Sequence, residues 1–122
     1  MFDYKLLISA FILVIIDSFY LKAVKNYFSK QIKIIQGSSM KINMTSAIIT
    51  YIFLITALNY FIVKPKRSIQ DAFLLGIIIY GVFETTNKAL FSKWSWLTVL
   101  FDTLWGGILF ALTTFIINLL PN

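Results

Sequence analysis

The sequence predicts an all-α fold, an integral membrane bundle of four transmembrane helices. Hydrophobic residues make up 59% of the 122 residues and charged residues 13%, whereas soluble domains are about 25% charged. The hydrophobic residues lie in long runs, which the core of a soluble domain does not need. Charged residues gather at the ends of these runs, at the depth of lipid headgroups. These observations predict a single membrane domain, residues 1–122.

The formal net charge of +6 comes from basic residues placed beside the hydrophobic runs. They include Lys22, Lys25, Lys30, Lys33 and Lys41 after the first run, and Lys64, Lys66 and Arg67 after the second. Basic residues at such places contact headgroups and set topology, so no nucleic-acid partner is expected. The sequence has no cysteine and no histidine, which excludes disulfides, thiolate chemistry and imidazole ligands of metals.

The first helix is predicted over residues 4–27. Its hydrophobic run, residues 6–16, follows Lys5 and in that respect is similar to the core of a signal peptide. A cleavable signal ends in small residues, whereas this run continues into Asp17 and Phe19. We therefore expect a retained transmembrane helix.

Residues 26–43 form the longest polar connection, and Gly37 is its expected break. One interpretation is an amphipathic helix that lies in the membrane interface with Ile32 and Ile35 in lipid. The other is a solvated basic loop. The sequence leaves both interpretations open.

The second helix is predicted over residues 44–63, which corresponds to about 30 Å at 1.5 Å for each residue. Pro65, which has basic neighbours, stops this helix because proline cannot continue it. The third helix is predicted over residues 69–91. Ser68 is its expected N-cap, and Asp71 at the third helical position completes a loose capping box.

Residues 92–95 form the next predicted turn, where Trp94 and Trp96 are expected to anchor the chain at the membrane interface. The fourth helix is predicted over residues 96–120. It ends before Pro121, which cannot extend it.

Four membrane spans place both termini on one side of the membrane. Seven lysines lie near the opposite side, namely Lys88, Lys93 and the five that follow the first run, whereas four basic residues lie near the termini. Cytoplasmic loops carry the excess of basic residues. We therefore expect a multi-pass membrane protein with both termini on the non-cytoplasmic side.

Three acidic residues fall inside the predicted spans. Glu84 lies nine residues before Lys93 and Asp102 nine residues after it, so two antiparallel helices carry both acids about 13 Å from the turn. Asp17 lies about ten residues before the end of the first predicted helix, which leaves the membrane on the same side. An ionisable group at membrane depth costs about 2.5–3.5 kcal/mol on insertion scales and usually faces a protein interior or a wet cavity. We therefore expect a polar pocket in this half of the membrane.

Helical spacing places further polar residues beside these acids. Asn87 and Lys88 share a stripe with Glu84 on the third predicted helix, and Trp105 shares one with Asp102 on the fourth. No catalytic residue is assigned, and metal binding is left open. The predicted ligand-binding or ion-binding residues are Asp17, Glu84, Asn87, Asp102 and Trp105, supported by Tyr80, Thr86, Lys88, Gly106, Tyr51 and Asn59.

The central residues also have purely structural interpretations. Glu84 and Lys88 are spaced as an i, i+4 ion pair, and Asp102 could accept hydrogen bonds as a helix–helix contact. Asp17 could lie at the headgroup boundary, and Trp105 could serve packing alone. The coincidence of three acids at one depth favours the pocket.

Three motifs are similar to those of a known family. They are Asp17-Ser18-Phe19-Tyr20-Leu21, Phe83-Glu84-Thr85-Thr86-Asn87 and Asp102-Thr103-Leu104-Trp105-Gly106. They resemble the Asp-x-x-Trp-Leu, Tyr-Asp-Leu-Thr-Asn and Asp-x-x-Trp-Gly motifs of small four-helix membrane proteins from bacteria and viruses, a family known only as a domain of unknown function. The third motif is intact, the first has Tyr for Trp, and the second keeps an acid despite three substitutions. The resemblance covers nearly the whole chain and implies a site at Asp17, Glu84, Asn87 and Asp102.

We expect the polar cluster to bind a cation, a proton or a small solute in the course of transport. An accessory or assembly subunit, whose cluster docks a partner helix, is the alternative. A lipid-modifying membrane enzyme is less favoured, because the sequence has no Ser-His-Asp or Cys-His set and no glycine-rich phosphate loop. No cofactor is expected. The expected partners are the lipid bilayer and, because four helices are few for a transport path, a second copy of the chain or another membrane protein.

Overall fold

The computed structural model describes residues 4–120. Within them the helices are α1 (Tyr4–Gln36), α2 (Met44–Leu58), the π-helical turn η1 (Asn59–Val63), α3 (Ile69–Leu90) and α4 (Trp96–Asn118). With η1 counted as the end of α2, four helices are long and apolar enough to cross a membrane. The predicted all-α membrane class is confirmed.

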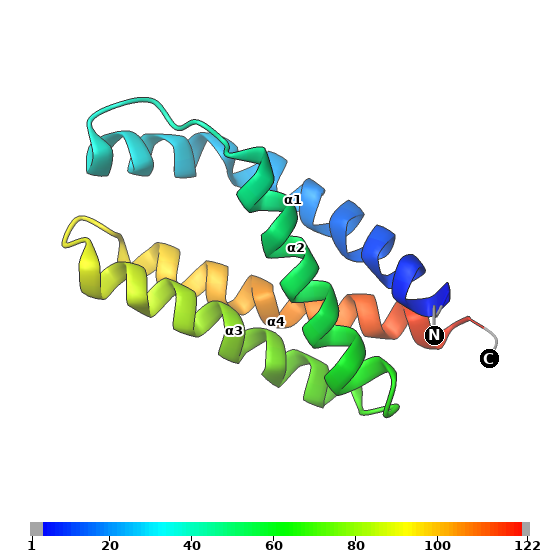
Figure 1. The fold of residues 1–122 in the computed structure, drawn as a ribbon. Helices are drawn as coiled ribbons and strands as arrows, with labels where there is room; N and C mark the ends of the chain where they lie inside the picture. The colour runs from blue at the N-terminus through cyan, green and yellow to red at the C-terminus, as the bar shows by residue number, and fades with distance from the viewer. Residues whose placement is uncertain (1–3, 121–122) are drawn as a thin grey trace.

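The helices form an open bundle with two distinct ends (Figure 1). α3 and α4 run side by side in opposite directions, and α2 crosses this pair at an angle. The α1–α2 loop and the α3–α4 turn lie at one end of the molecule, which we call the loop end. The start of α1 and the end of α4 lie at the opposite, terminal end.

Side-chain caps start three of the helices. Asn43 accepts a hydrogen bond from the backbone N–H of Ser46 at the start of α2, and Ser95 caps α4. Ser68 caps α3 as predicted, with 3.0 Å between its Oγ and the backbone nitrogen of Asp71. The carboxylate of Asp71 accepts from the Arg67 Nε–H at 2.9 Å, which ties the α2–α3 turn to the first turn of α3.

The first helix does not end near residue 27, as the sequence predicted, but continues to Gln36. The added residues include no glycine or proline, and Gly37 (φ 77°) ends the helix with a hydrogen bond from its N–H to the Lys33 carbonyl oxygen. Buried Gln31 holds this extension against α4, because its Oε1 accepts from the Ser95 backbone N–H. At 33 residues and 1.5 Å each, α1 is about 50 Å long and exceeds a bilayer core of about 30 Å.

The other predicted helix ends lie close to the observed ones. The second helix reaches Val63, and its last turn is a π-helix in which the Lys64 N–H bonds to the Asn59 carbonyl oxygen. The fourth helix ends at Asn118, two residues before its predicted end. The predicted stop at Pro121 lies outside the described residues.

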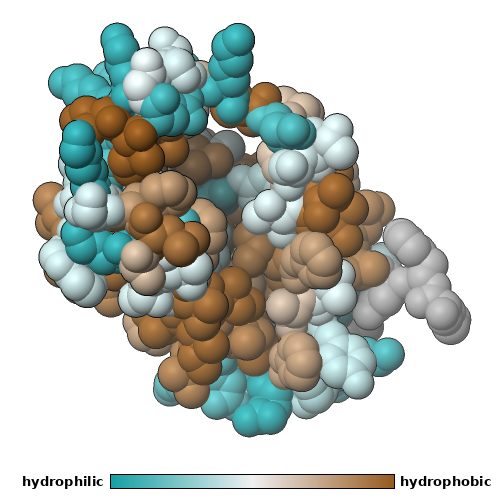
Figure 2. All heavy atoms as spheres, turned by 60° about the vertical axis from the view of Figure 1, so that its left-hand side comes forward, coloured by the Kyte–Doolittle hydropathy of each residue, from teal (hydrophilic) through white to brown (hydrophobic). Residues whose placement is uncertain are grey.

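The α3–α4 pair is close because glycines face each other. A Cβ on Gly76 would overlap the backbone carbonyl of Gly106, and a Cβ on Gly106 would overlap the ring of Tyr80. Small residues allow this backbone approach between helices in a membrane. There, close packing rather than the hydrophobic effect drives helix association. Hydrophobic side chains also reach the outer surface in broad patches, as Figure 2 shows.

The glycine contact predicts that Gly76→Ala separates α3 from α4. Its Cβ would meet backbone atoms, which cannot rotate away, so we expect a loss of about 1–3 kcal/mol in the free energy of unfolding. Gly81→Ala on the same helix is the control. There the nearest atom is the Thr103 Cγ2 at 3.5 Å, an ordinary contact, so alanine should be neutral or stabilising by up to about 1 kcal/mol.

Unfolding of both variants in mixed micelles, followed by circular dichroism, measures this difference. Equal unfolding midpoints for the two variants would show that the glycine contact does not hold the pair.

Candidate functional site

The three acids of the predicted spans are all buried at the loop-end half of the bundle. Asp17 on α1 is 6% exposed, Glu84 on α3 is 0% exposed and Asp102 on α4 is 7% exposed. Asp102 lies close enough to the other two for their charges to interact. The structure therefore brings together three carboxyl groups that are far apart in the sequence.

Two hydrogen bonds of opposite direction join α1 to α4. The Tyr20 hydroxyl on α1 donates to Asp102 Oδ1 at 2.8 Å, and the Trp105 Nε1–H on α4 donates to Asp17 Oδ1 at 2.8 Å. The donor rings stack with centroids 4.4 Å apart and an interplanar angle of 5°. Each helix thus contributes an acid and, three residues later, an aromatic donor to the acid of the other helix. We call Asp17, Tyr20, Asp102 and Trp105 the reciprocal pair.

The Asp17 carboxylate receives a second donor from α2. The Tyr51 hydroxyl donates a short hydrogen bond to Asp17 Oδ2, so both Asp17 oxygens are engaged. Tyr80 on α3 lies within range of the Asp17 and Asp102 charges. Asp17 is therefore the point at which donors from α2 and α4 meet α1.

Glu84 is bonded on one oxygen only. The Trp94 Nε1–H, from the α3–α4 turn, donates to Glu84 Oε1 at 2.8 Å. Among the described residues Glu84 Oε2 has no hydrogen-bond donor, although it is fully buried. The Glu84 and Asp102 carboxyl groups lie next to each other, close enough for one to hydrogen-bond the other when a proton lies between them. Without that proton, two acceptors face each other in a buried place.

Within the described part of the chain, no lysine or arginine forms a salt bridge with these acids. The one salt bridge among residues 4–120 joins Arg67 and Asp71. The alternative of a Glu84–Lys88 ion pair is wrong, because the Lys88 Nζ donates to the Ser92 carbonyl oxygen at 3.0 Å. The same ammonium lies 5.6 Å from the ring centroid of Trp96. The acids are therefore surrounded by neutral donors.

The remaining predicted site residues lie at different places. Gly106 contacts the Tyr80 ring beside the carboxyl groups. Asn87 is half-buried and Thr86 is exposed, and neither forms a side-chain hydrogen bond among the described residues. Asn59 is farther away, because its amide donates to Ser9 Oγ at 2.6 Å, and Ser9 lies about 12 Å before Asp17 along α1.

Sequence reasoning missed two donors. Trp94 was expected to anchor the chain at the interface, but it is 5% exposed and bonds to Glu84. Trp96 is 66% exposed, as an interfacial residue should be. Tyr20 was recognised only as a position of the first motif and was not predicted to be a site residue. For Tyr20 the available signal was a repeated spacing, because Tyr20 follows Asp17 by three residues just as Trp105 follows Asp102.

A groove leads to Asp17 from outside the bundle. It has a volume of about 640 Å³ and lies between the second half of α1, the first half of α2 and Tyr80 of α3. Asp17, Tyr51 and Tyr80 line its inner part, and Lys22 and Lys25 line its outer part. We call this the α1–α2 groove.

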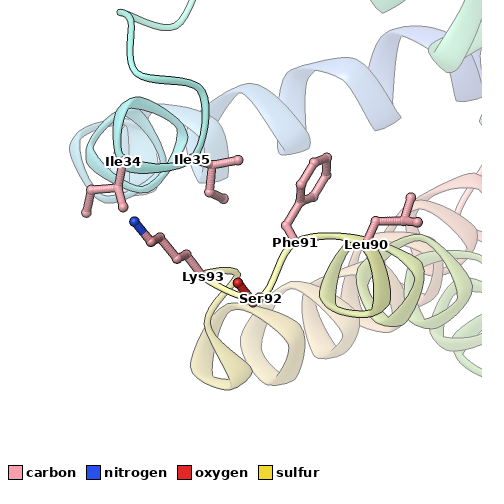
Figure 3. Close-up of a pocket in the computed structure, with 6 residues that line it drawn as sticks. All are labelled: Ile34, Ile35, Leu90, Phe91, Ser92 and Lys93. Atoms are coloured by element: carbon pink, nitrogen blue, oxygen red, sulfur yellow. The ribbon is translucent and has the colours of Figure 1, made fainter.

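A second, smaller pocket of about 260 Å³ lies at the loop end, between the end of α1 and the α3–α4 turn. Figure 3 shows Ile35 and Phe91 on opposite walls and the Lys93 side chain extending toward Ile34. No acid lines this pocket. It is therefore separate from the carboxyl groups.

The described residues contain no group of three or more acids, histidines or cysteines arranged to hold a metal ion. Four of the six carboxyl oxygens of Asp17, Glu84 and Asp102 accept hydrogen bonds from tyrosine and tryptophan donors. The arrangement is suited to exchanging protons and hydrogen bonds.

The fold and this site define a multi-pass membrane protein with buried acids. The family described as "Predicted membrane protein (DUF2177)" matches residues 4–119. The chain belongs to this family, whose function is unknown, which confirms the resemblance drawn from the motifs. No curated protein and no solved structure matches the chain.

The Trp94–Glu84 contact predicts that Trp94→Phe destabilises the protein by about 1–3 kcal/mol, because it removes the donor to a fully buried carboxyl oxygen. Trp96→Phe is the control, since Trp96 is exposed and its contact with Lys88 is worth about 0.5–1 kcal/mol. Thermal unfolding in detergent compares the two. An equal loss in both variants would mean that the Trp94 hydrogen bond contributes nothing of its own.

Proposed function

We propose that the protein binds and releases a proton at the Glu84 and Asp102 carboxyl groups as a step in transport across its membrane. The observation that carries this proposal is Glu84 Oε2, a fully buried oxygen with no donor among the described residues, in a carboxyl group that lies close to that of Asp102. A proton between the two carboxyl groups supplies the missing donor. It also removes one of two like charges that repel each other in a low-dielectric environment.

The surroundings favour a proton over a metal ion. A calcium ion takes six to eight oxygen ligands and a magnesium ion six, whereas both Asp17 oxygens and one oxygen each of Glu84 and Asp102 already accept hydrogen bonds. A proton needs no coordination shell and moves along hydroxyl groups such as those of Tyr20 and Tyr51.

Infrared spectroscopy of the protein in lipid at neutral pH tests this proposal. We expect a carboxylic-acid C=O band in the wild type that is absent in Glu84→Gln and shifted in Asp102→Asn. Asp71→Asn is the control, because Asp71 is partly exposed and paired with Arg67, so the band should not change. A wild-type spectrum with carboxylate bands alone would refute the shared proton.

The transport part of the proposal needs a separate measurement. In liposomes with an imposed pH gradient, Glu84→Gln should lower proton flux at least tenfold relative to Asp71→Asn. If the infrared band is present and neither protein conducts protons above empty liposomes, the site binds a proton but does not move protons by itself.

We also propose that the loop end faces the cytoplasm, because it carries the larger number of basic residues. The absence of native cysteine allows single cysteines to report sidedness without background. In intact spheroplasts, an impermeant maleimide should label Gln70→Cys at the terminal end and should label Ser39→Cys only after permeabilisation. The reverse pattern would invert the topology.

A further inference from the structure

We infer that the α1–α2 groove binds one acidic phospholipid, with the phosphate at Lys22 and Lys25 and an acyl chain against the hydrophobic walls. The groove is separate from the Glu84–Asp102 contact, so this inference does not depend on proton binding. Its basis is the combination of shape, wall chemistry and charge along one groove.

The walls fit an acyl chain. Leu21 and Phe28 of α1 face Ala47 and Leu54 of α2 across the groove, and Ile42 of the connecting loop lies at its margin. The volume of about 640 Å³ lies within the range of roughly 300–1,000 Å³ typical of small-molecule sites. The walls belong to transmembrane helices, so lipid reaches them directly from the bilayer.

The mouth fits a phosphate. Lys22 and Lys25 lie three residues apart on α1, so both ammonium groups project on the same side of the helix. Both side chains are exposed, and neither has a salt-bridge partner among residues 4–120. They follow Asp17 by five and eight residues, about 8 Å and 12 Å along the helix, which places them toward headgroup depth. Basic pockets between transmembrane helices are a recognised form of acidic-lipid site.

The acid in the groove does not cancel this charge. Asp17 is the acidic residue of its lining, and both Asp17 oxygens accept hydrogen bonds from Tyr51 and Trp105. The mouth therefore carries two positive charges and the inner end a hydrogen-bonded carboxylate. A phospholipid with a net negative headgroup matches this order better than a zwitterionic one, whose own ammonium would meet the lysines.

Binding of spin-labelled phosphatidylglycerol to the protein in phosphatidylcholine nanodiscs tests the inference, because an immobilised spectral component reports bound lipid. We expect a preference for spin-labelled phosphatidylglycerol over spin-labelled phosphatidylcholine in the wild type. The double variant Lys22→Gln, Lys25→Gln should weaken phosphatidylglycerol binding by about tenfold or more, since each basic residue near the surface adds to the attraction. The control is Lys30→Gln, Lys33→Gln, which removes the same charge from the same helix outside the groove.

A second pair of variants tests the acyl-chain part. Ala47→Phe fills the groove and should abolish the immobilised component, whereas Ile48→Phe places the same ring on the exposed neighbouring position and should leave it unchanged. Neither residue is buried, so neither added ring has to enter the core.

Three results would overturn the inference. They are equal binding of phosphatidylglycerol and phosphatidylcholine, an equal loss in the two lysine pairs, and an unchanged immobilised component in Ala47→Phe. The first two would indicate ordinary boundary lipid drawn by overall charge, and the third would place the lipid elsewhere.

Discussion

The position of α1 depends on the reciprocal pair, in which Tyr20 donates to Asp102 and Trp105 donates to Asp17. Between helices in a membrane there is little hydrophobic driving force, so close packing and hydrogen bonds hold a bundle together. α3 and α4 have the glycine contact at Gly76, whereas α1 contains no glycine. Two bonds of opposite direction, joined by stacked rings, fix both the rotation and the height of α1 against α4.

The chemistry of these donors determines what the site can do. Hydroxyl and indole groups stabilise a carboxylate without neutralising it. A lysine or arginine would instead balance its charge in an ion pair. Around Asp17, Glu84 and Asp102 the described donors are all neutral. A carboxylate that such donors hold keeps its charge, which is costly at membrane depth. The same neutral donors also join α1 to α2 and α4.

The depth of the acids was predictable, and their partners were not. A rise of 1.5 Å for each residue, counted from the turn between α3 and α4, placed Glu84 and Asp102 at one depth, because the helix rise is nearly constant. Which donor each acid meets depends on how the helices rotate against one another, and no local pattern encodes this rotation. That is why Tyr20 and Trp94 were missed as donors and why Thr86, on a polar stripe, proved exposed. The length of α1 was missed for a different reason, since residues 28–36 form a helix through the tertiary bonds of Gln31.

The order of side chains along α1 explains why the site is open to one side. Ser9, Leu13 and Asp17 follow each other at intervals of four residues on the buried face. Leu13 lies between Ser9 and Asp17 on this face and belongs to an apolar cluster in which Leu58 and Phe110 are also fully buried. The polar Ser9–Asn59 contact lies nearer the terminal end. The α1–α2 groove, by contrast, reaches Asp17 from the loop end. The described groove thus approaches Asp17 on one side, and apolar side chains lie on the other. The transport proposed above would therefore require this apolar part to rearrange or a second chain to complete the path.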